Sequence, residues 1–295
     1  MTRKRNRRGA APLPPGREER RPPRGARAEG ALAPVTQPDP SPALRDARRE
    51  KPRERREAEA ARIYGFHSVE AALKAPRREP IRLYATAAAA ERLQPEIAAR
   101  GIEVRIMSLD EIAARAPREA VHQGVLLEAR PLAPMDISEL PEKGLVIVLD
   151  QITDPHNVGA ILRTAAAFAV DALLTTERHS PEFSGALAKS ASGGLEHVPI
   201  CTVTNLARAL DEMGDMGYLR VGLDSEGPVP LARVALSRPL ALALGAEGKG
   251  LRRLTRERCD VLARLELPGA IKSLNVSNAC AIALALAYGK LEAGK

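Results

Sequence analysis

Six short apolar runs between residues 145 and 267 constrain the fold of this chain most strongly. Segments with helical spacing separate the runs, which are LVIVLD (145–150), DALLTT (171–176), HVPICTV (197–203), YLRVGLD (218–224), PLALALG (239–245) and VLARLEL (261–267). Several are rich in Val, Ile and Leu without polar alternation, which is typical of strands in a parallel sheet buried on both faces. The pattern predicts an α/β domain with a mostly parallel sheet, whose ligands bind beyond the carboxyl ends of the strands.

A smaller αβ pattern precedes this domain. Helices are predicted over 63–75, 87–101 and from 108 onward, and strands over 81–86, 102–107 and 121–129. Gly101 is suited to end the second helix, and Ser108 with Glu111 forms a capping-box pattern at the start of the third. We place this small αβ domain at residues 62–132, a proline-containing linker at 133–143 and the larger domain at 144–295.

Residues 1–61 differ from the rest of the chain in charge and proline content. Residues 1–60 contain 17 Lys and Arg against 9 Asp and Glu, and 10 of the 24 prolines, whereas the remaining 28 basic and 28 acidic residues cancel. This composition predicts a disordered basic tail. Such a tail suits a polyanionic partner, because each Lys or Arg near a phosphate releases counterions. A solubilising extension without a partner is the alternative.

Export and membrane signals are not evident in the sequence. No apolar run approaches the roughly 20 residues of a membrane span, and the opening MTRKRNRRGAAPLPPG contains no apolar secretory segment. Cys201, Cys259 and Cys280 match no zinc spacing and indicate reduced, packed thiols. We therefore predict a cytoplasmic protein with no membrane partner.

Three loops at predicted strand ends are the candidate sites for chemistry: DPHNVGAILRT (154–164), GAEGKG (245–250) and PGAIKSLNVSN (268–278). His156 suggests a metal ligand, but no second histidine or cysteine pair shares its loop, so no metal site is predicted. GAEGKG is either a tight turn or a loop whose backbone approaches a flat ligand. It matches neither a dinucleotide nor a nucleoside-triphosphate motif.

Two of these loops allow a structural as well as a functional interpretation. The Ser and Asn residues of SLNVSN cap a helix or bind a ligand, and four such residues exceed the needs of one cap. Arg163 lies early in a predicted helix among apolar residues. It is either a surface side chain with a buried stem or a cation for a phosphate, and the residues alone leave both open.

Taken together, the three loops resemble the three motifs of the SpoU, or TrmH, family of RNA ribose 2′-O-methyltransferases. The first motif corresponds to Asn157, Gly159, Arg163 and Thr164, the second to Gly245–Gly250 and the third to Ser273–Ser277. KSASGGLEHVPI and TNLARAL resemble the segment between the motifs. IYGFHSVEAAL and HQGVLLEA resemble the two ends of the L30e-like substrate-binding domain of the members that act on ribosomal RNA.

The resemblance implies a fold, a cofactor and partners. The larger domain is expected to form an α/β trefoil knot, a threading that is rare among folds, and the smaller one an L30e-like αβ domain. The cofactor is expected to be S-adenosylmethionine, the substrate a guanosine in 23S ribosomal RNA, and the assembly a homodimer with its active site near the subunit interface.

The resemblance also assigns roles to residues. Cofactor contacts are expected from Leu244, Gly245, Gly248, Leu274 and either Leu265 or Leu267. The last choice is open because Pro268 lies two residues later than in relatives. Asn157, Glu247, Ser273 and Asn275 are expected to position the substrate or the catalytic arginine.

Arg163 is the expected catalytic residue. Because arginine is effectively always protonated, a role as simple general base is awkward. We expect it to bind the adjacent phosphate and to stabilise the developing alkoxide of the 2′-oxygen.

Other functions remain compatible with the sequence. The substrate could be tRNA in place of 23S RNA, or the chain could be a ribosome-assembly factor that binds RNA without catalysis. A nucleotide-dependent oxidoreductase on a doubly wound sheet is a third alternative, and the missing dinucleotide motif counts against it.

Overall fold

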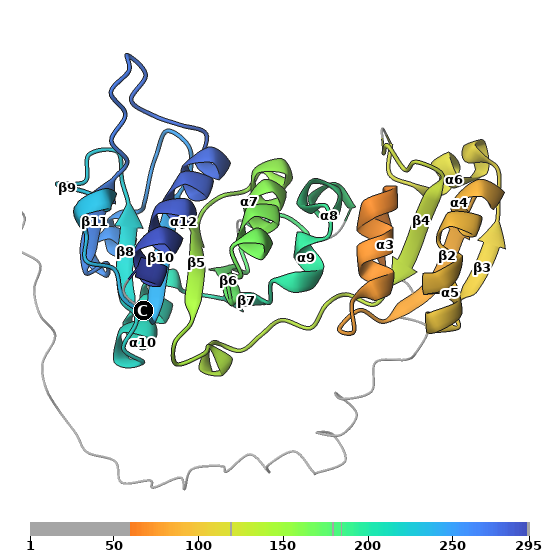
Figure 1. Ribbon diagram of the computed structural model, residues 1–295, viewed down its shortest axis with the longest axis horizontal. Helices are drawn as coiled ribbons and strands as arrows, with labels where there is room; N and C mark the ends of the chain where they lie inside the picture. The colour runs from red at the N-terminus through yellow and green to blue at the C-terminus, as the bar shows by residue number, and fades with distance from the viewer. Residues whose placement is uncertain (1–59, 119, 179, 184, 294–295) are drawn as a thin grey trace, which may run out of the picture. The chain divides into compact units, whose positions relative to one another are not determined.

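The computed structural model describes residues 60–118, 120–178, 180–183 and 185–293. The predicted tail at 1–61 therefore lies almost entirely outside the described residues. Those residues all belong to one compact unit and form two sheets (Figure 1). Among them, no helix is both long and apolar enough to cross a membrane.

The larger sheet has seven parallel strands in the described part of the chain, in the order β7-β6-β5-β10-β8-β11-β9. Their bounds are β5 Leu145–Asp150, β6 Ala172–Thr176, β7 Ile200–Val203, β8 Leu219–Leu223, β9 Val229–Pro230, β10 Leu240–Gly245 and β11 Val261–Arg264. Each of the six apolar runs contains one of these strands, so the predicted α/β architecture with a parallel sheet is confirmed. The two-residue strand β9 was not predicted.

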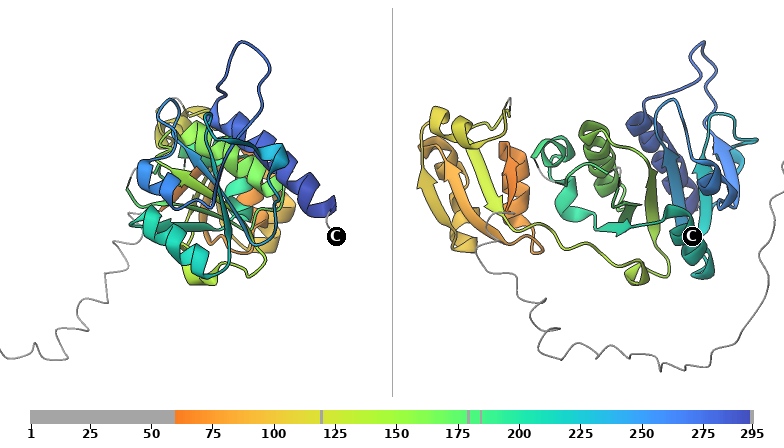
Figure 2. Two further views of the ribbon diagram at one scale, coloured as in Figure 1. Left: turned by 90° about the vertical axis from the view of Figure 1, so that its left-hand side faces the viewer. Right: turned by 180° about the vertical axis from the view of Figure 1, so that it is seen from behind.

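Helices cover both faces of this sheet (Figures 1 and 2). They are α7 Pro155–Ala167, α8 Gly185–Ala191, α9 Gly194–His197, α10 Leu206–Asp215, α11 Arg253–Glu257 and α12 Val276–Ala293. Alternate residues of β5 point to opposite faces: Leu145 and Ile147 pack in the cluster that includes α7 and α12, whereas Val146 and Val148 pack with α10. Burial on both faces explains why the run LVIVLD has no polar alternation.

The smaller sheet has the order β1-β4-β2-β3, with β2 and β3 parallel and the other pairs antiparallel. Its strands are β1 Ala61–Tyr64, β2 Pro80–Ala85, β3 Glu103–Ile106 and β4 Val125–Ala129, and its helices are α3 Phe66–Lys74, α4 Ala87–Arg92, α5 Gln94–Arg100 and α6 Leu109–Arg115. The capping box of Ser108 and Glu111 is confirmed, and Gly101 ends α5 with a φ of 59°.

Two of the predicted helices in this part of the chain are present with different bounds. The segment predicted as a helix from residue 63 begins as a strand, because Ile63 pairs with Leu127 in β1 and β4. Gly65, with a φ of 88°, turns the chain into α3. The helix predicted over 87–101 is divided at Leu93 into α4 and α5.

The cysteines are packed as predicted. Cys201 and Cys280 are buried and Cys259 is partly buried. Burial raises the pKa of the Cys201 thiol to about 11 and of Cys259 and Cys280 to about 12. All three thiols therefore stay protonated near neutral pH.

Candidate active site

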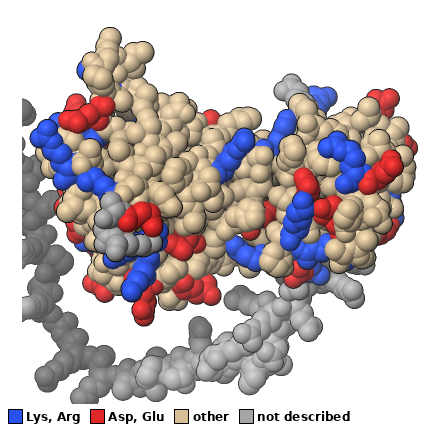
Figure 3. Space-filling model, in the orientation of Figure 1, with Lys and Arg blue, Asp and Glu red and all other residues tan. Residues whose placement is uncertain are grey.

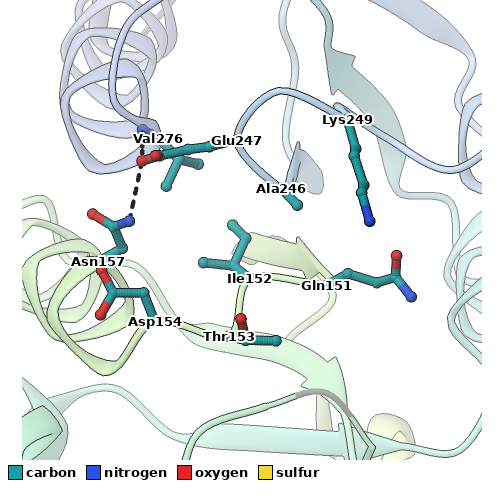
Figure 4. Close-up of a pocket in the computed structure, with 9 residues that line it drawn as sticks. All are labelled: Gln151, Ile152, Thr153, Asp154, Asn157, Ala246, Glu247, Lys249 and Val276. Carbon is teal, nitrogen blue, oxygen red and sulfur yellow. Dashed lines mark hydrogen bonds between the residues drawn. The ribbon is translucent and has the colours of Figure 1, made fainter.

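The three motif loops meet at the carboxyl ends of two neighbouring strands. In β5 and β10, Asp150 is paired with Gly245, so the loop that leads into α7 starts beside the loop GAEGKG. The start of α12 brings the third loop to the same place, as Figure 4 shows for Val276 beside Glu247. The parallel topology thus explains why segments about 90 and 30 residues apart in sequence share one site.

A hydrogen-bond cluster ties the three loops together. Glu247 Oε1 accepts hydrogen bonds from Asn157 Nδ2 at 3.1 Å and from the Val276 amide at 3.3 Å (Figure 4). It also accepts one from Asn275 Nδ2 at 2.7 Å. Asn275 Nδ2 also donates to Asn157 Oδ1 at 2.9 Å. Three of the five predicted catalytic residues are therefore in direct contact, and the carboxylate that joins them is exposed.

Asn275 caps a helix, which is one of the roles that the sequence left open, and it also contacts Glu247. Its Oδ1 accepts hydrogen bonds from the amide of Ser277 at 2.9 Å and from the hydroxyl of Ser277 at 2.6 Å, at the first turn of α12. This is the geometry of a helix cap. The same side chain belongs to the cluster around Glu247, so the cap fixes where its amide nitrogen lies.

The loop GAEGKG folds back on its own start. The amide of Gly250 donates to the Ala246 carbonyl oxygen at 2.8 Å, and a Cβ at Gly245 would collide with the backbone of Gly250. Gly248 and Gly250 have φ values of 74° and 64°, which favour glycine. The glycines therefore make the tight turn, and the turn presents Glu247 to the neighbouring loops.

An ion pair between the buried Asp150 and the partly exposed Arg252 lies next to this loop, and it was not predicted from the sequence. Asp150 is fully buried, and its carboxylate accepts from Arg252 Nε at 2.6 Å and from the Arg252 amide at 2.9 Å. A buried carboxylate needs such partners. The acid that ends the otherwise apolar run LVIVLD was the available signal for this contact.

Two adjoining cavities open at the loops. The first, about 490 Å³, is lined by Gln151–Asp154, Asn157, Ala246, Glu247, Lys249 and Val276 (Figure 4). The second, about 370 Å³, is lined by Leu223–Ser225, Leu244–Gly248, Gly250, Leu265, Leu267, Lys272–Leu274, Val276 and Ala279. Ala246, Glu247 and Val276 belong to both, so the cluster around Glu247 lies at their boundary.

The second cavity brings together all the residues expected to contact a cofactor. They are Leu244, Gly245, Gly248, Leu265, Leu267 and Leu274. The strand β11 ends at Arg264, so Leu265 and Leu267 both follow it and both line the cavity. Ser273 lies here too, apart from the cluster around Glu247.

Arg163 and Asn275 are the two predicted site residues that line neither cavity. Asn275 belongs to the cluster around Glu247, whereas Arg163 lies apart from it. Arg163 lies on α7, six residues after Asn157, and is exposed. Of its neighbours in the first motif, Thr164 donates its hydroxyl to the Ala160 carbonyl oxygen at 3.0 Å. His156 is exposed at the start of the helix, where Asp154 caps its amide at 3.0 Å.

Family models match both parts of the chain. Residues 144–285 match the SpoU rRNA Methylase family, and residues 62–135 match the model described as RNA 2′-O ribose methyltransferase substrate binding. These two segments contain the larger and the smaller sheet, respectively.

Individual relatives match along nearly their whole length. The chain is 39% identical over 235 residues to the 23S rRNA (guanosine-2′-O-)-methyltransferase RlmB of Pseudomonas aeruginosa, which covers 76% of this chain and 94% of that relative. Among solved structures, the AdoMet-bound rRNA methyltransferase from Sinorhizobium meliloti is 23% identical, with a TM-score of 0.69 over 85% of this chain and 95% of that one. The SpoU methyltransferase AviRb from Streptomyces viridochromogenes is 21% identical, with a TM-score of 0.69 over 83% and 95%.

Proposed function

Because the chain belongs to the SpoU rRNA methylase family, we propose that it transfers a methyl group from S-adenosylmethionine to the ribose 2′-hydroxyl of a guanosine in 23S ribosomal RNA. The observation that carries the proposal is the pair of adjoining cavities that share Glu247 at the junction of three motif loops. The guanosine and the 23S RNA are the substrate named for the relative in P. aeruginosa.

The second cavity fits the cofactor chemically. Leucine side chains and the glycine backbone of the GAEGKG loop offer an apolar slot with backbone groups at its edge, which is typical of sites for a flat nucleoside. S-adenosylmethionine, when bound there, supplies the methyl group on a positively charged sulfur. Leu265 and Leu267 both line the cavity, so we assign this edge of the site to the pair.

The first cavity is the proposed site of the target nucleotide. Glu247 and Asn157 lie at its border with the cofactor cavity. They can hold the ribose hydroxyls in line with the reacting methyl group, and such positioning accounts for much of the rate of a group transfer. Ser273 and Asn275 hold the third loop around this junction.

Arg163 is the proposed catalytic group. Its exposure on α7 leaves the guanidinium accessible to an RNA phosphate, and its permanent charge suits stabilisation of the 2′-alkoxide. RNA that enters the first cavity comes close to this helix, because α7 begins at Pro155 and its first turn, with Asn157, lines the cavity. We expect the arginine to act in the RNA-bound enzyme.

The smaller domain, at residues 62–132, is the proposed RNA-binding part. Residues 133–143 are the proposed linker, and residues 144–295 are the proposed methyltransferase domain. On the face shown in Figure 3, Lys and Arg side chains are interspersed with Asp and Glu and form no single basic surface. The excess of positive charge lies in residues 1–60. We propose that these residues add salt-dependent affinity for RNA.

A homodimer and a knot complete the proposal. Ile282, Leu286 and Tyr288 are exposed on α12, and a second subunit would cover apolar side chains of this kind. The knot is what the family implies for the larger domain. A substrate in ribosomal RNA places the proposed activity in the cytoplasm.

A transfer assay tests this function. The purified chain is incubated with methyl-labelled S-adenosylmethionine and either 23S RNA or tRNA. We expect label in 23S RNA only. Label in tRNA only supports the tRNA alternative, and cofactor binding without any transfer overturns the proposed activity.

A further inference from the structure

Arg78 and Glu196 form a buried ion pair that joins the smaller domain to the larger one. Arg78 lies between α3 and β2 of the smaller domain, and Glu196 lies on α9 of the larger one. Arg78 Nε donates to Glu196 Oε2 at 3.0 Å and Arg78 Nη2 to Oε1 at 2.7 Å. The side chains are 1% and 2% exposed. The third guanidinium nitrogen, Nη1, donates to the Arg130 carbonyl oxygen at the end of the smaller domain, at 3.0 Å.

The geometry of this pair fixes an orientation. A planar guanidinium that meets both oxygens of a carboxylate allows one relative arrangement of the two groups. Burial strengthens the constraint, because any domain rotation would leave two unpaired charges away from water. A surface ion pair between long side chains imposes little constraint of this kind.

The helix that holds Glu196 also touches the helix of the catalytic motif. A Cβ on Gly194, in α9, would lie 2.7 Å from the Leu162 carbonyl oxygen and 2.9 Å from the Cα of Arg163. The backbones of α9 and α7 are therefore in close contact at the proposed catalytic residue. A displacement of α9 must move that part of α7 or open a gap.

Two further hydrogen bonds connect the smaller domain, through α8, to the start of α7. Ser68, on α3, donates its hydroxyl to the Ala188 carbonyl oxygen of α8 at 3.1 Å. Two residues on, the Ser190 hydroxyl donates to the Pro155 carbonyl oxygen, at the first residue of α7, at 3.2 Å. The smaller domain is thus bonded to both helices that brace the one with Asn157 and Arg163.

We propose that Arg78 and Glu196 are positioning residues that hold the RNA-binding domain at a fixed orientation to α7, so that bound RNA presents its target ribose to the motif loops. This inference rests on the proposed function, in which residues 62–132 bind RNA. It assigns a role in turnover to two residues outside the cavities and the three motifs.

The test compares Arg78→Met and Glu196→Gln with wild type and with Arg220→Met. The control removes an arginine paired with Asp260 inside the larger domain, on β8. For each protein, kcat and KM on 23S RNA, the affinities for RNA and S-adenosylmethionine, and the melting temperature are measured well below the melting transition of the least stable variant.

We expect both junction variants to bind cofactor and RNA within about twofold of wild type while kcat falls at least about tenfold, since misplacement by 1 Å can reduce turnover about 100-fold. Arg78→Lys should recover part of kcat, because it keeps the charge and loses the fork. The control should keep wild-type kcat.

A lower melting temperature with unchanged kcat would show that the pair only stabilises the protein and would overturn the inference. So would loss of cofactor affinity in parallel with kcat. If the single variants do not fold, Arg78→Met combined with Glu196→Met removes both charges; wild-type kcat in that protein overturns the inference, and low kcat supports it. Absence of methyl transfer by the wild type counts against the proposed function. The role of Arg78 and Glu196 is tested separately, by the ratio of the kcat of each variant to that of the wild type.

Discussion

Glu247 and Glu196 are carboxylates held in opposite ways. Glu247 is exposed and is held by neutral amide donors at the starts of α7 and α12. Glu196 is buried, and both of its oxygens bind one guanidinium. Neutral donors fix the position of a carboxylate without neutralising its charge, so Glu247 can still act on a ligand. A buried guanidinium satisfies the charge of Glu196 and converts it into a rigid connection.

Asp150 shows an intermediate case. It is as buried as Glu196, but its partner Arg252 is 44% exposed and contributes its backbone amide as well as its side chain. The pair joins the end of β5 to the segment after the GAEGKG loop. In both pairs a buried carboxylate is satisfied by an arginine.

Glu196→Gln should have the largest effect on stability. Breaking a buried ion pair leaves an unpaired charge, and we expect a loss of about 3 to 5 kcal/mol in the free energy of unfolding. Denaturant titration measures it. A loss of unfolding free energy below about 1 kcal/mol would show that Glu196 is no more important for stability than we expect Glu247 to be.

Arg163→Ala should have the largest effect on turnover among the motif residues. Arg163 is exposed where Arg78 is buried, so its removal should leave stability and cofactor affinity nearly unchanged. Loss of a charge that stabilises the transition state should reduce kcat by about 100- to 1000-fold. Single-turnover methylation measures the loss of activity, and calorimetry with S-adenosylmethionine measures the cofactor affinity. Near-normal turnover would exclude the proposed role.

Glu247→Gln should separate charge from position. The variant keeps an oxygen that can accept from Asn157 and Asn275, so we expect a change in stability below about 1 kcal/mol. A hydrogen bond from a substrate hydroxyl to the charged carboxylate is stronger than one to the neutral amide by about 1 kcal/mol. The activity of the variant should therefore fall about five- to tenfold. Unfolding curves and kcat on 23S RNA provide the test, and equal loss of stability in this variant and in Glu196→Gln would contradict the comparison.

Ser277→Ala should have the smallest effect. It removes the hydroxyl that donates to Asn275 Oδ1 but leaves the backbone cap of α12 intact. We expect a loss of about 0.5 to 1 kcal/mol and less than about a threefold change in kcat. A loss above tenfold in kcat would mean that Ser277 has a direct role at the site.

The sequence predicted the features that depend on local pattern. Uniform apolar runs located the parallel strands, and Ser108 with Glu111 located a helix start. The motif spacing placed Asn157, Glu247 and Asn275 at one sheet edge. It could not place Arg163, because the direction of a helix away from the sheet depends on the packing of α8 and α9.

The supporting contacts could not be predicted from pattern. Arg78 and Glu196 are 118 residues apart, and Asp150 and Arg252 are 102 apart. Asp150 stands out at the end of an apolar run, but nothing in the pattern indicates that its partner is Arg252. The strand β1 was missed because ARIY is too short to show alternation, and its pairing with β4 arises only in the folded domain.

Nucleoside analysis of methylated 23S RNA tests the central claim most directly. Unmodified 23S RNA is incubated with the purified chain and S-adenosylmethionine, digested to nucleosides and analysed by mass spectrometry, with Arg163→Ala as the control. We predict one 2′-O-methylguanosine per RNA with the wild-type chain and almost none with the variant. A methyl group on a base, on another nucleoside or on no nucleoside at all would contradict the account.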